Sequence, residues 1–141
     1  MISTVAVGAD GSATSSKAVE FAAELALRFD AELVLVSAFS KSGGGRGGGG
    51  EPDESDWAVT SSSRVREILT RAEHTLERKG ISCRTLVDEG DPADVLVRLA
   101  ADCDADLLVI GNKGMGRKIL GSVPNSVTHK AHCSVVVVKT T

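Results

Sequence analysis

The sequence predicts an α/β protein whose parallel sheet is covered by helices on both faces. Short apolar, β-branched runs alternate with segments of helical periodicity along the 141 residues. Two of these runs, 32–39 and 106–111, are almost continuously apolar, which is typical of strands buried on both sides. The expected order is βαβαβαβαβ, with five parallel strands joined by right-handed crossovers.

Residues 4–9 are expected to form the first strand, because the run TVAVGA stops at Asp10-Gly11-Ser12, a turn sequence. A helix is predicted from Ser15 to Phe29, where apolar residues recur at helical spacing and charged residues occupy the other side. Residues 32–39 follow as the second strand. Asp10 is a candidate cap for the first helix.

Residues 40–56 differ in kind, with seven glycines in the eight positions 43–50. We predict a flexible insertion here, because so little of it can be buried. A second helix follows and ends at Arg78-Lys79-Gly80, a favoured stop. Residues 81–88 alternate in polarity, as expected for a strand at a sheet edge.

The last part of the chain supplies two more helices and two more strands. Asp91 is placed to cap a helix, and Pro92 to occupy its first position. The strand 106–111 is followed by a glycine-bearing loop and by a short helix that opens at Gly121-Ser122 and ends near Ala131. Residues 134–139, SVVVVK, are the fifth strand.

Composition indicates one domain spanning residues 1–141. The chain is 42% apolar, and a chain of this size buries roughly 68–70% of its unfolded surface without disulfides or a structural metal. Cys83, Cys103 and Cys133 are scattered without a CxxC pair, so we expect reduced thiols that fill the core.

Charge and hydropathy exclude several partner classes. The chain has 16 Lys+Arg against 19 Asp+Glu, for a net charge of −3. This balance argues against binding nucleic acid or an anionic membrane through bulk electrostatics. No apolar run approaches the roughly 20 residues of a spanning helix, and the first residues lack a basic leader. We therefore expect a cytoplasmic protein.

The chemistry is expected where the first and fourth strands end, because ligands of open parallel sheets settle outside the carboxyl ends of strands at the point where strand order reverses. Glycines let an anion approach backbone N–H groups, and a helix N-terminus favours negative charge. Ser122 can cap the last helix and donate to a phosphate. The glycines and cations of this region are Gly111, Gly114, Gly116, Gly121, Lys113, Arg117 and Lys118.

Two nucleotide motifs are absent. The P-loop pattern GxxxxGK[ST] does not occur, and GxGxxG fails after Gly114 and Gly116 because Ile119 stands where the third glycine belongs. Mononucleotide binding remains, and so does the simpler interpretation that this segment is a glycine turn leading into a capped helix.

Two segments, VAVGADGS and GNKGMGRKILGSVPNSV, together with the βα order between them, resemble the universal stress proteins over nearly the whole chain. The resemblance implies an adenine nucleotide alpha-hydrolase-like fold, which is Rossmann-like, with strand order 3-2-1-4-5. It also implies ATP binding through a motif of Gly, two residues, Gly, nine residues, Gly and Ser or Thr.

Carried onto this chain, the resemblance implies a role for each matching residue. Asp10 would face the ribose or a metal such as Mg²⁺, and Ala38 would meet adenine through its main chain. Ala9 and Ile110 would line the pocket. The phosphates would be held by Gly111, Gly114, Gly121 and Ser122, with the backbone of Val123.

One departure from the motif affects the choice of nucleotide. Only six residues, Met115 to Leu120, separate Gly114 from Gly121, three fewer than in the family. Gly116 and the basic pair Arg117-Lys118 can compensate for the shorter loop. AMP or cyclic AMP is the alternative to ATP.

The resemblance implies a regulatory stress-response protein that forms a homodimer through residues 134–139, an apolar sheet edge. No catalytic residue is predicted, and slow ATP hydrolysis, at most, would follow from a bound metal and basic residues without a dedicated base. One alternative is a nucleotide-free dimeric interaction module. A phosphatase that uses Asp10 as nucleophile is a weaker one, because Ser12 stands where such enzymes need a second Asp.

Overall fold

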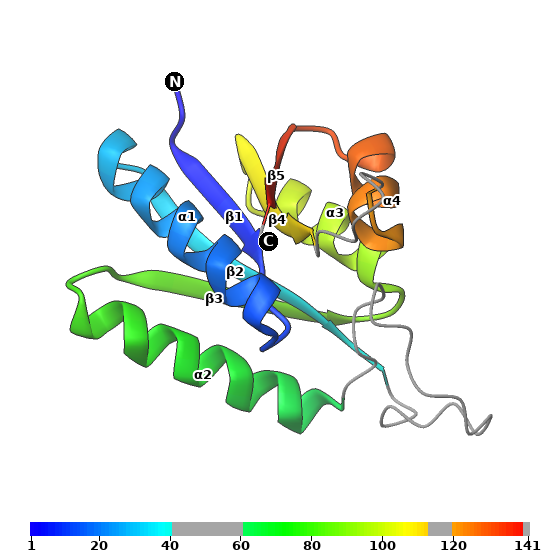
Figure 1. Cartoon of the computed structure of the whole chain (residues 1–141), viewed down its shortest axis with the longest axis horizontal. Helices are drawn as coiled ribbons and strands as arrows, with labels where there is room; N and C mark the ends of the chain where they lie inside the picture. Colours follow the sequence, from blue (N-terminus) through cyan, green and yellow to red (C-terminus); the bar gives the residue numbers. More distant parts are fainter. Residues whose placement is uncertain (41–60, 113–119, 140–141) are drawn as a thin grey trace.

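The computed structural model describes residues 1–40, 61–112 and 120–139. Within these ranges the chain forms one sheet and the helices that cover it (Figure 1). The predicted alternation of strands and helices is confirmed. In chain order the elements are β1 (Thr4–Gly8), α1 (Ala13–Phe29), β2 (Glu32–Phe39), α2 (Ser62–Arg78), β3 (Cys83–Glu89), α3 (Pro92–Asp102), β4 (Leu107–Asn112), α4 (Ser122–Lys130) and β5 (Ser134–Lys139).

The sheet has the order β3-β2-β1-β4-β5, and every pairing is parallel. Val5 of β1 lies opposite Leu33 of β2 on one side and Leu107 of β4 on the other. The expected order 3-2-1-4-5 is therefore confirmed. Strand order reverses between β1 and β4, so a ligand is expected at their carboxyl ends.

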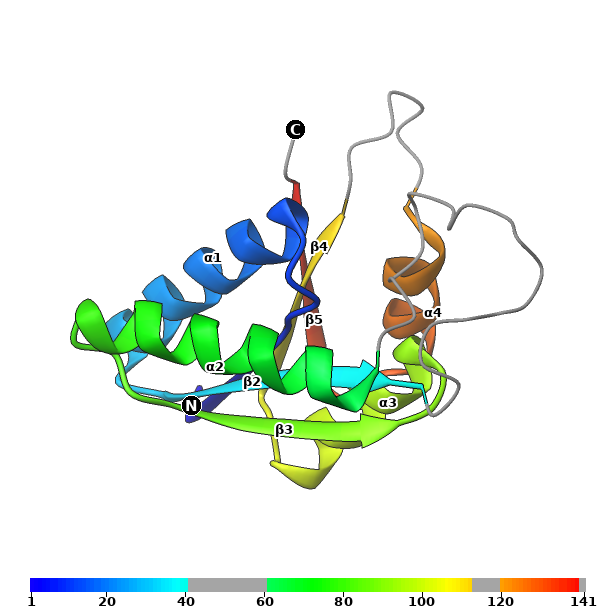
Figure 2. The same ribbon diagram turned by 90° about the horizontal axis from the view of Figure 1, so that it is seen from below.

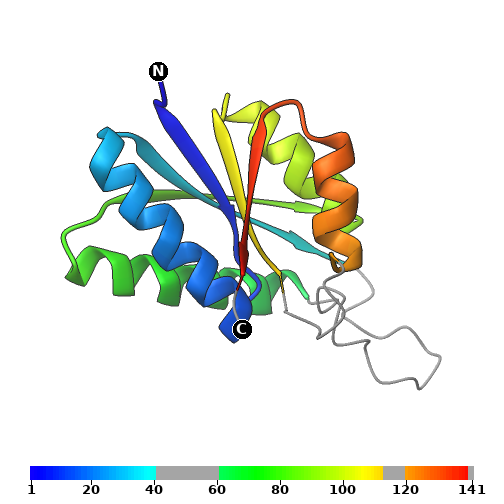
Figure 3. The same cartoon turned by 45° about the horizontal axis from the view of Figure 1, so that its top comes forward.

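Helices cover both faces of the sheet. Figures 2 and 3 show α1 and α2 on one face and α3 and α4 on the other. Because successive side chains of a strand point to opposite faces, β1 sends Val5 and Val7 to the α1 and α2 side and Ala6 to the α3 and α4 side. The central strands are buried on both sides, as their apolar sequences predict.

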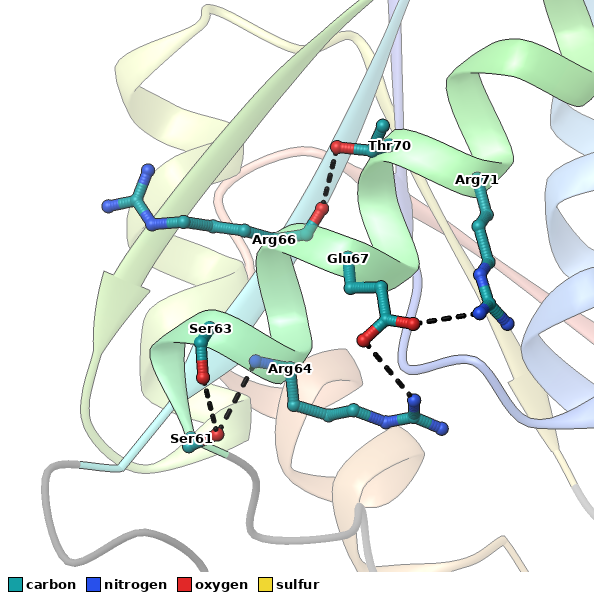
Figure 4. Close-up of polar contacts among 7 residues, drawn as sticks. All are labelled: Ser61, Ser63, Arg64, Arg66, Glu67, Thr70 and Arg71. Atoms are coloured by element: carbon teal, nitrogen blue, oxygen red, sulfur yellow. Dashed lines mark hydrogen bonds and ion pairs between the residues drawn. The ribbon is translucent and has the colours of Figure 1, made fainter.

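Side-chain caps begin three of the helices. Ser12 caps α1, Ser61 caps α2 and Asp91 caps α3, with Pro92 in the first turn. Ser61 Oγ accepts from the N–H of Arg64 at 3.3 Å (Figure 4). The predicted start of α3 is confirmed. α1 begins at Ala13, earlier than the expected Ser15, because Ser12 and not Asp10 is its cap.

Some strand boundaries differ from the prediction by one or two residues. β3 begins at Cys83 and not at residue 81, because Ile81 N–H still bonds the carbonyl of Leu76 as the chain leaves α2. β4 runs one residue further than expected and includes Asn112, while β1 ends at Gly8. The glycine-rich segment predicted over 40–56 lies, from residue 41 onward, outside the described residues.

The three cysteines are free and lie in or beside the apolar core, as predicted. Cys103 is buried, and Cys83 and Cys133 are half-buried. Burial, reinforced by Glu73 and Glu77, raises the pKa of the Cys83 thiol to about 11. Among the described residues, no helix is both long and apolar enough to cross a bilayer.

Candidate functional site

The turn between β1 and α1 holds Asp10 in a fixed position. Asp10 Oδ1 accepts from the N–H of Ser12 at 2.9 Å and from its hydroxyl at 2.5 Å. Asp10 N–H donates to Ser15 Oγ at 3.2 Å, and Ser12 Oγ in turn accepts from the N–H of Ser15. Within the described residues, no hydrogen bond uses Oδ2 of Asp10. Asp10 therefore presents a positioned, half-exposed carboxylate oxygen.

Gly11 lets this turn close. Its φ of +84° lies in the left-handed region, which costs a side chain strain and glycine none. A Cβ added here would stand 3.0 Å from Cδ1 of Ile68 on α2. The turn between Asp10 and the α1 cap therefore depends on the absence of a side chain.

The first turn of α1 lies directly against the end of β4. A Cβ on Gly111 would come within 2.7 Å of both Cγ2 and the carbonyl oxygen of Thr14. Only a glycine permits this approach, because one of the two opposing atoms is backbone. Gly111 thereby brings the β1–α1 turn and the end of β4 together, the two segments that the sequence identified as the site.

Asn112 joins the end of β4 to the start of α4. Asn112 is buried, and its Oδ1 accepts from the N–H of Gly121 at 2.9 Å. The first bond of the α4 ladder runs from Asn125 N–H to the Gly121 carbonyl. The backbone amides at the start of α4 thus lie at the carboxyl edge of the sheet, where a helix N-terminus favours an anion.

Gly121, and not Ser122, is the N-cap of α4, and this cap makes no side-chain hydrogen bond. The expectation that Ser122 caps the helix is therefore wrong. Ser122 occupies the first helical position, so its hydroxyl lies one residue inside the helix. Val123 follows it and is buried at 7% exposure, which leaves its backbone as the part that could meet a ligand.

Three other predicted residues lie at strand ends with their side chains in the core. Ala9 is 2% exposed, and its N–H donates to the Val36 carbonyl at 3.0 Å, which extends the β1–β2 contact. Ala38 near the end of β2 and Ile110 in β4 are also buried. Their main chains and not their side chains are the groups near the carboxyl edge. Lys113, Gly114, Gly116 and Arg117 lie outside the described residues.

Sequence reasoning missed Asn112 and Thr14. The sequence places Asn112 in the loop after the fourth strand. A polar residue directly after the apolar run 107–111 is nevertheless a signal for a side chain that ties the strand end to a neighbouring segment. Thr14 was placed before the first helix, and nothing in the sequence shows that its carbonyl abuts Gly111. That contact depends on how α1 crosses β4.

A cavity lies on the α1 and α2 face of the sheet. The groove between these helices holds about 500 Å³ and has an apolar floor that includes Val19, Ala23 and Leu76. Its rim carries Glu20 and Glu24 from α1 and arginines from α2, among them Arg64 and Arg71. Both arginines pair with Glu67, at 3.6 Å and 2.8 Å (Figure 4). We call this cavity the α1–α2 groove.

Comparison with known proteins assigns the fold to a family. The model of the universal stress protein family matches residues 1–139. The chain belongs to the universal stress protein family. The predicted resemblance is therefore confirmed, and it extends over nearly the whole sequence.

Two relatives match over most of their length. Universal stress protein Rv1636 of Mycobacterium tuberculosis is 40% identical over 145 residues, which cover 98% of this chain and 97% of the relative. Universal stress protein MJ0531 of Methanocaldococcus jannaschii is 34% identical over 146 residues, which cover 96% and 81%.

Solved universal stress proteins share the architecture. One, in complex with cAMP, is 29% identical with a TM-score of 0.73 and covers 97% of this chain and 96% of its own. A family member from Arabidopsis thaliana with AMP bound is 20% identical with a TM-score of 0.73, covers 99% and 92%, and matches at the level of the fold.

Proposed function

We propose that this universal stress protein binds an adenine nucleotide at the carboxyl edge of the sheet, between β1 and β4, and acts as a regulatory protein of the stress response. One observation carries the proposal: the contact of Gly111 with Thr14 joins the fixed Asp10 turn to the strand end that Asn112 ties to α4. A carboxylate and a helix N-terminus at one crevice suit the ribose and the phosphate of one ligand.

Each end of the nucleotide has a proposed partner. Asp10 faces a ribose hydroxyl, and the main chain of Ala38 meets adenine, with Ala9 and Ile110 beneath. The phosphate lies at the start of α4, against the backbone of Gly121, Ser122 and Val123. Lys113, Gly114, Gly116 and Arg117, outside the described residues, complete the phosphate contacts proposed from the sequence.

The nucleotide is proposed to be ATP or a monophosphate such as AMP or cyclic AMP. The solved relative that contains cAMP, at 29% identity, supports the monophosphate. The loop of six residues between Gly114 and Gly121 favours the same choice, because it spans less space than the motif of the family.

A magnesium ion would enter with a phosphate-rich nucleotide. Mg²⁺ is usually held by one or two carboxylates together with phosphate oxygens. Asp10 fits this role, because Ser12 occupies only its Oδ1. The ion would neutralise phosphate charge, and Asp10 would fix its position.

The proposed action is regulatory and not catalytic. Asp10 is held by Ser12 as an acceptor, and no nucleophile with its own general base stands beside it in the described residues. We propose a cytoplasmic homodimer through residues 134–139, in which bound nucleotide alters dimer behaviour or partner choice. A slow ATPase is the most that the arrangement supports.

Calorimetric titration with ATP, AMP, cyclic AMP and adenosine tests this function. We expect Asp10→Ala to weaken all four ligands at least tenfold, because all carry the ribose. Gly121→Ala should weaken only the phosphate-bearing ligands, because it adds a Cβ where the phosphate is proposed to lie. The φ of −61° at Gly121 accepts that Cβ without backbone strain. His74→Ala, at an exposed position on α2, is the control.

Failure of wild type to bind any of the four ligands would contradict the proposal. The chain would then be a nucleotide-free interaction module, the alternative that its apolar β5 edge favours. If Gly121→Ala weakened the binding of adenosine and of AMP equally, the phosphate would not lie at the start of α4.

A further inference from the structure

The α1–α2 groove is a cavity of small-molecule size to which the proposed function assigns no ligand. Its volume of about 500 Å³ falls within the roughly 300–1,000 Å³ that is typical of ligand pockets. Figures 2 and 3 show the two helices on the same face of the sheet. Both start at the carboxyl edge and end at the amino edge, because each follows one parallel strand and precedes the next. The groove therefore has a carboxyl end near Gly11 and an amino end near Ile81.

The floor of the groove is apolar. Val19, Ala23 and Leu76 are buried there, and the half-buried Ile68 and Ala72 continue the apolar lining along α2. The small side chains of Ala23 and Ala72 leave space between the helices. An apolar ligand would gain free energy here by replacing water along the floor.

The shape of the groove favours an extended ligand. Its lining runs along α2 from Arg64 to Lys79, which corresponds to roughly 22 Å at about 1.5 Å per residue. A volume of about 500 Å³ spread over this length leaves a narrow channel. An unbranched alkyl chain fits such a channel, whereas a third helix, with a diameter of about 10–12 Å, is too wide.

The charges along the groove are only partly neutralised by one another. The charged residues of the lining are Arg64, Arg71, Lys79, Glu20 and Glu24. Both arginines pair with Glu67, and Glu24 pairs with Arg28 at 3.4 Å. Within residues 1–40, 61–112 and 120–139, Lys79 and Glu20 form no ion pair. The groove thus offers one cation and one carboxylate to a ligand, at different places along its length.

The amino end of the groove combines apolar surface with the available cation. Leu27 is 61% exposed, and it lines this end together with Lys79 and the buried Ile81. A lysine ammonium beside apolar surface suits an anionic head group whose tail lies on that surface. Glu20, in the carboxyl half of the groove, would repel the same head group. Charge therefore fixes the direction in which such a ligand lies.

We propose that the α1–α2 groove binds an amphiphile with one anionic head group and an unbranched alkyl tail, of the class of medium-chain fatty acids. The carboxylate of the ligand pairs with Lys79 at the amino end. The tail runs over Leu76 and Ala23 toward Ile68. This site depends neither on nucleotide binding nor on dimerisation.

Calorimetric titration of the full chain with octanoate, decanoate and dodecanoate, each below its micelle concentration, tests the proposal. We expect each added pair of methylenes to tighten binding about fifteenfold, because every buried methylene adds apolar contact. Dodecyltrimethylammonium has a tail of similar length and a cationic head group. It should bind at least tenfold more weakly than dodecanoate.

Two pairs of variants test the head and the tail separately. Lys79→Glu should weaken dodecanoate at least tenfold and reverse the preference between the two head groups. Arg78→Glu makes the same change of charge at the neighbouring position, outside the groove, and should leave the affinity within twofold. Ala72→Phe should abolish binding by filling the channel, whereas Thr70→Phe, exposed and outside the groove, should not.

The outcomes that overturn the proposal are distinct. A wild type that binds none of the three fatty acids overturns it entirely. Equal losses in Lys79→Glu and Arg78→Glu overturn the role of Lys79. An affinity that does not depend on tail length, or that survives Ala72→Phe, overturns the placement of the tail. Thermal unfolding without ligand checks that each variant folds.

Discussion

Individual residues at the carboxyl edge combine structural and binding roles. Asp10 fixes the turn through Ser12, and its second oxygen remains available for a ligand. Position 111 requires glycine, because a side chain there would collide with the backbone carbonyl of Thr14. Gly111, which the sequence motif relates to phosphate binding, is thus also required for packing. Its replacement should therefore lower the stability of the fold as well as the affinity for a ligand.

Gly111→Ala is expected to destabilise the protein by about 1–3 kcal/mol, the usual cost of overpacking. The added Cβ would meet Thr14 Cγ2 and the Thr14 carbonyl at 2.7 Å, so α1 must move away from β4. Urea unfolding followed by circular dichroism measures the change. Thr14→Ala in the same background removes only the Cγ2 contact and should restore part of the loss. An unchanged unfolding midpoint for Gly111→Ala would contradict this account.

The identities of the site residues could be predicted better than their partners. Asp10 and Gly111 follow apolar runs, and the switch-point rule places both at one edge without any structure. The Asn112–Gly121 bond and the Thr14–Gly111 contact could not be predicted, because each depends on the crossing of two elements. Ser122 was taken as a cap from its residue type, whereas the backbone makes Gly121 the cap.

At the amino edge of the sheet, the Asp106 carboxylate links the start of β1 to the start of β4. Asp106, just before β4, accepts from the N–H groups of Ser3 and Thr4 at 2.7 Å and 3.0 Å. These two hydrogen bonds hold the pKa of Asp106 below its ordinary value of 3.8. Asp106 thereby aligns the starts of β1 and β4, the two strands that flank the switch point.

Asp106 should make the protein sensitive to acid. Its lowered pKa means that the unfolded chain takes up the proton more readily than the folded chain. The stabilisation is therefore present above the unfolded pKa and is lost as pH falls from there through the lower, folded pKa. Asp106→Asn should flatten the decline of the melting temperature in this range. Asp102→Asn, exposed on α3, is the control and should keep the wild-type slope.

Helix starts show which boundaries a sequence can specify. Asp91 and Pro92 mark the start of α3 because both residues act locally, within one turn. α2 was recognised by its apolar spacing, but its start at Ser62 was not, since several serines precede it and any could cap. The choice of Ser61 is fixed by its bond to Arg64, while Glu67 bridges Arg64 and Arg71 one turn later (Figure 4).

The whole molecule should respond to ligand as a single cooperative unit. A ligand that binds only the folded state, at 100 times its dissociation constant, stabilises it by about 2.7 kcal/mol. We expect AMP or ATP to raise the melting temperature in a saturable way, with Asp10→Ala shifting the midpoint of that rise to higher ligand concentration. Guanosine monophosphate is the control nucleotide, and an equal rise with it would contradict adenine recognition. Protein concentration is held constant, because the proposed dimerisation would also affect the transition.

At this scale the fold was largely predictable. The alternation of strands and helices, the buried central strands and the exposed β5 edge all depend on local pattern together with general rules of handedness. The strand order came from the family resemblance and is confirmed.

The parallel arrangement also has a practical consequence for handling the protein. Every strand starts at one edge and finishes at the other, so Met1 projects from the edge opposite Asp10, while Lys139 emerges beside it (Figure 1). An affinity tag, fluorophore or biosensor tether fused before Met1 would therefore leave the proposed nucleotide site open to titrant. The same attachment after β5 would crowd the carboxyl edge of the sheet.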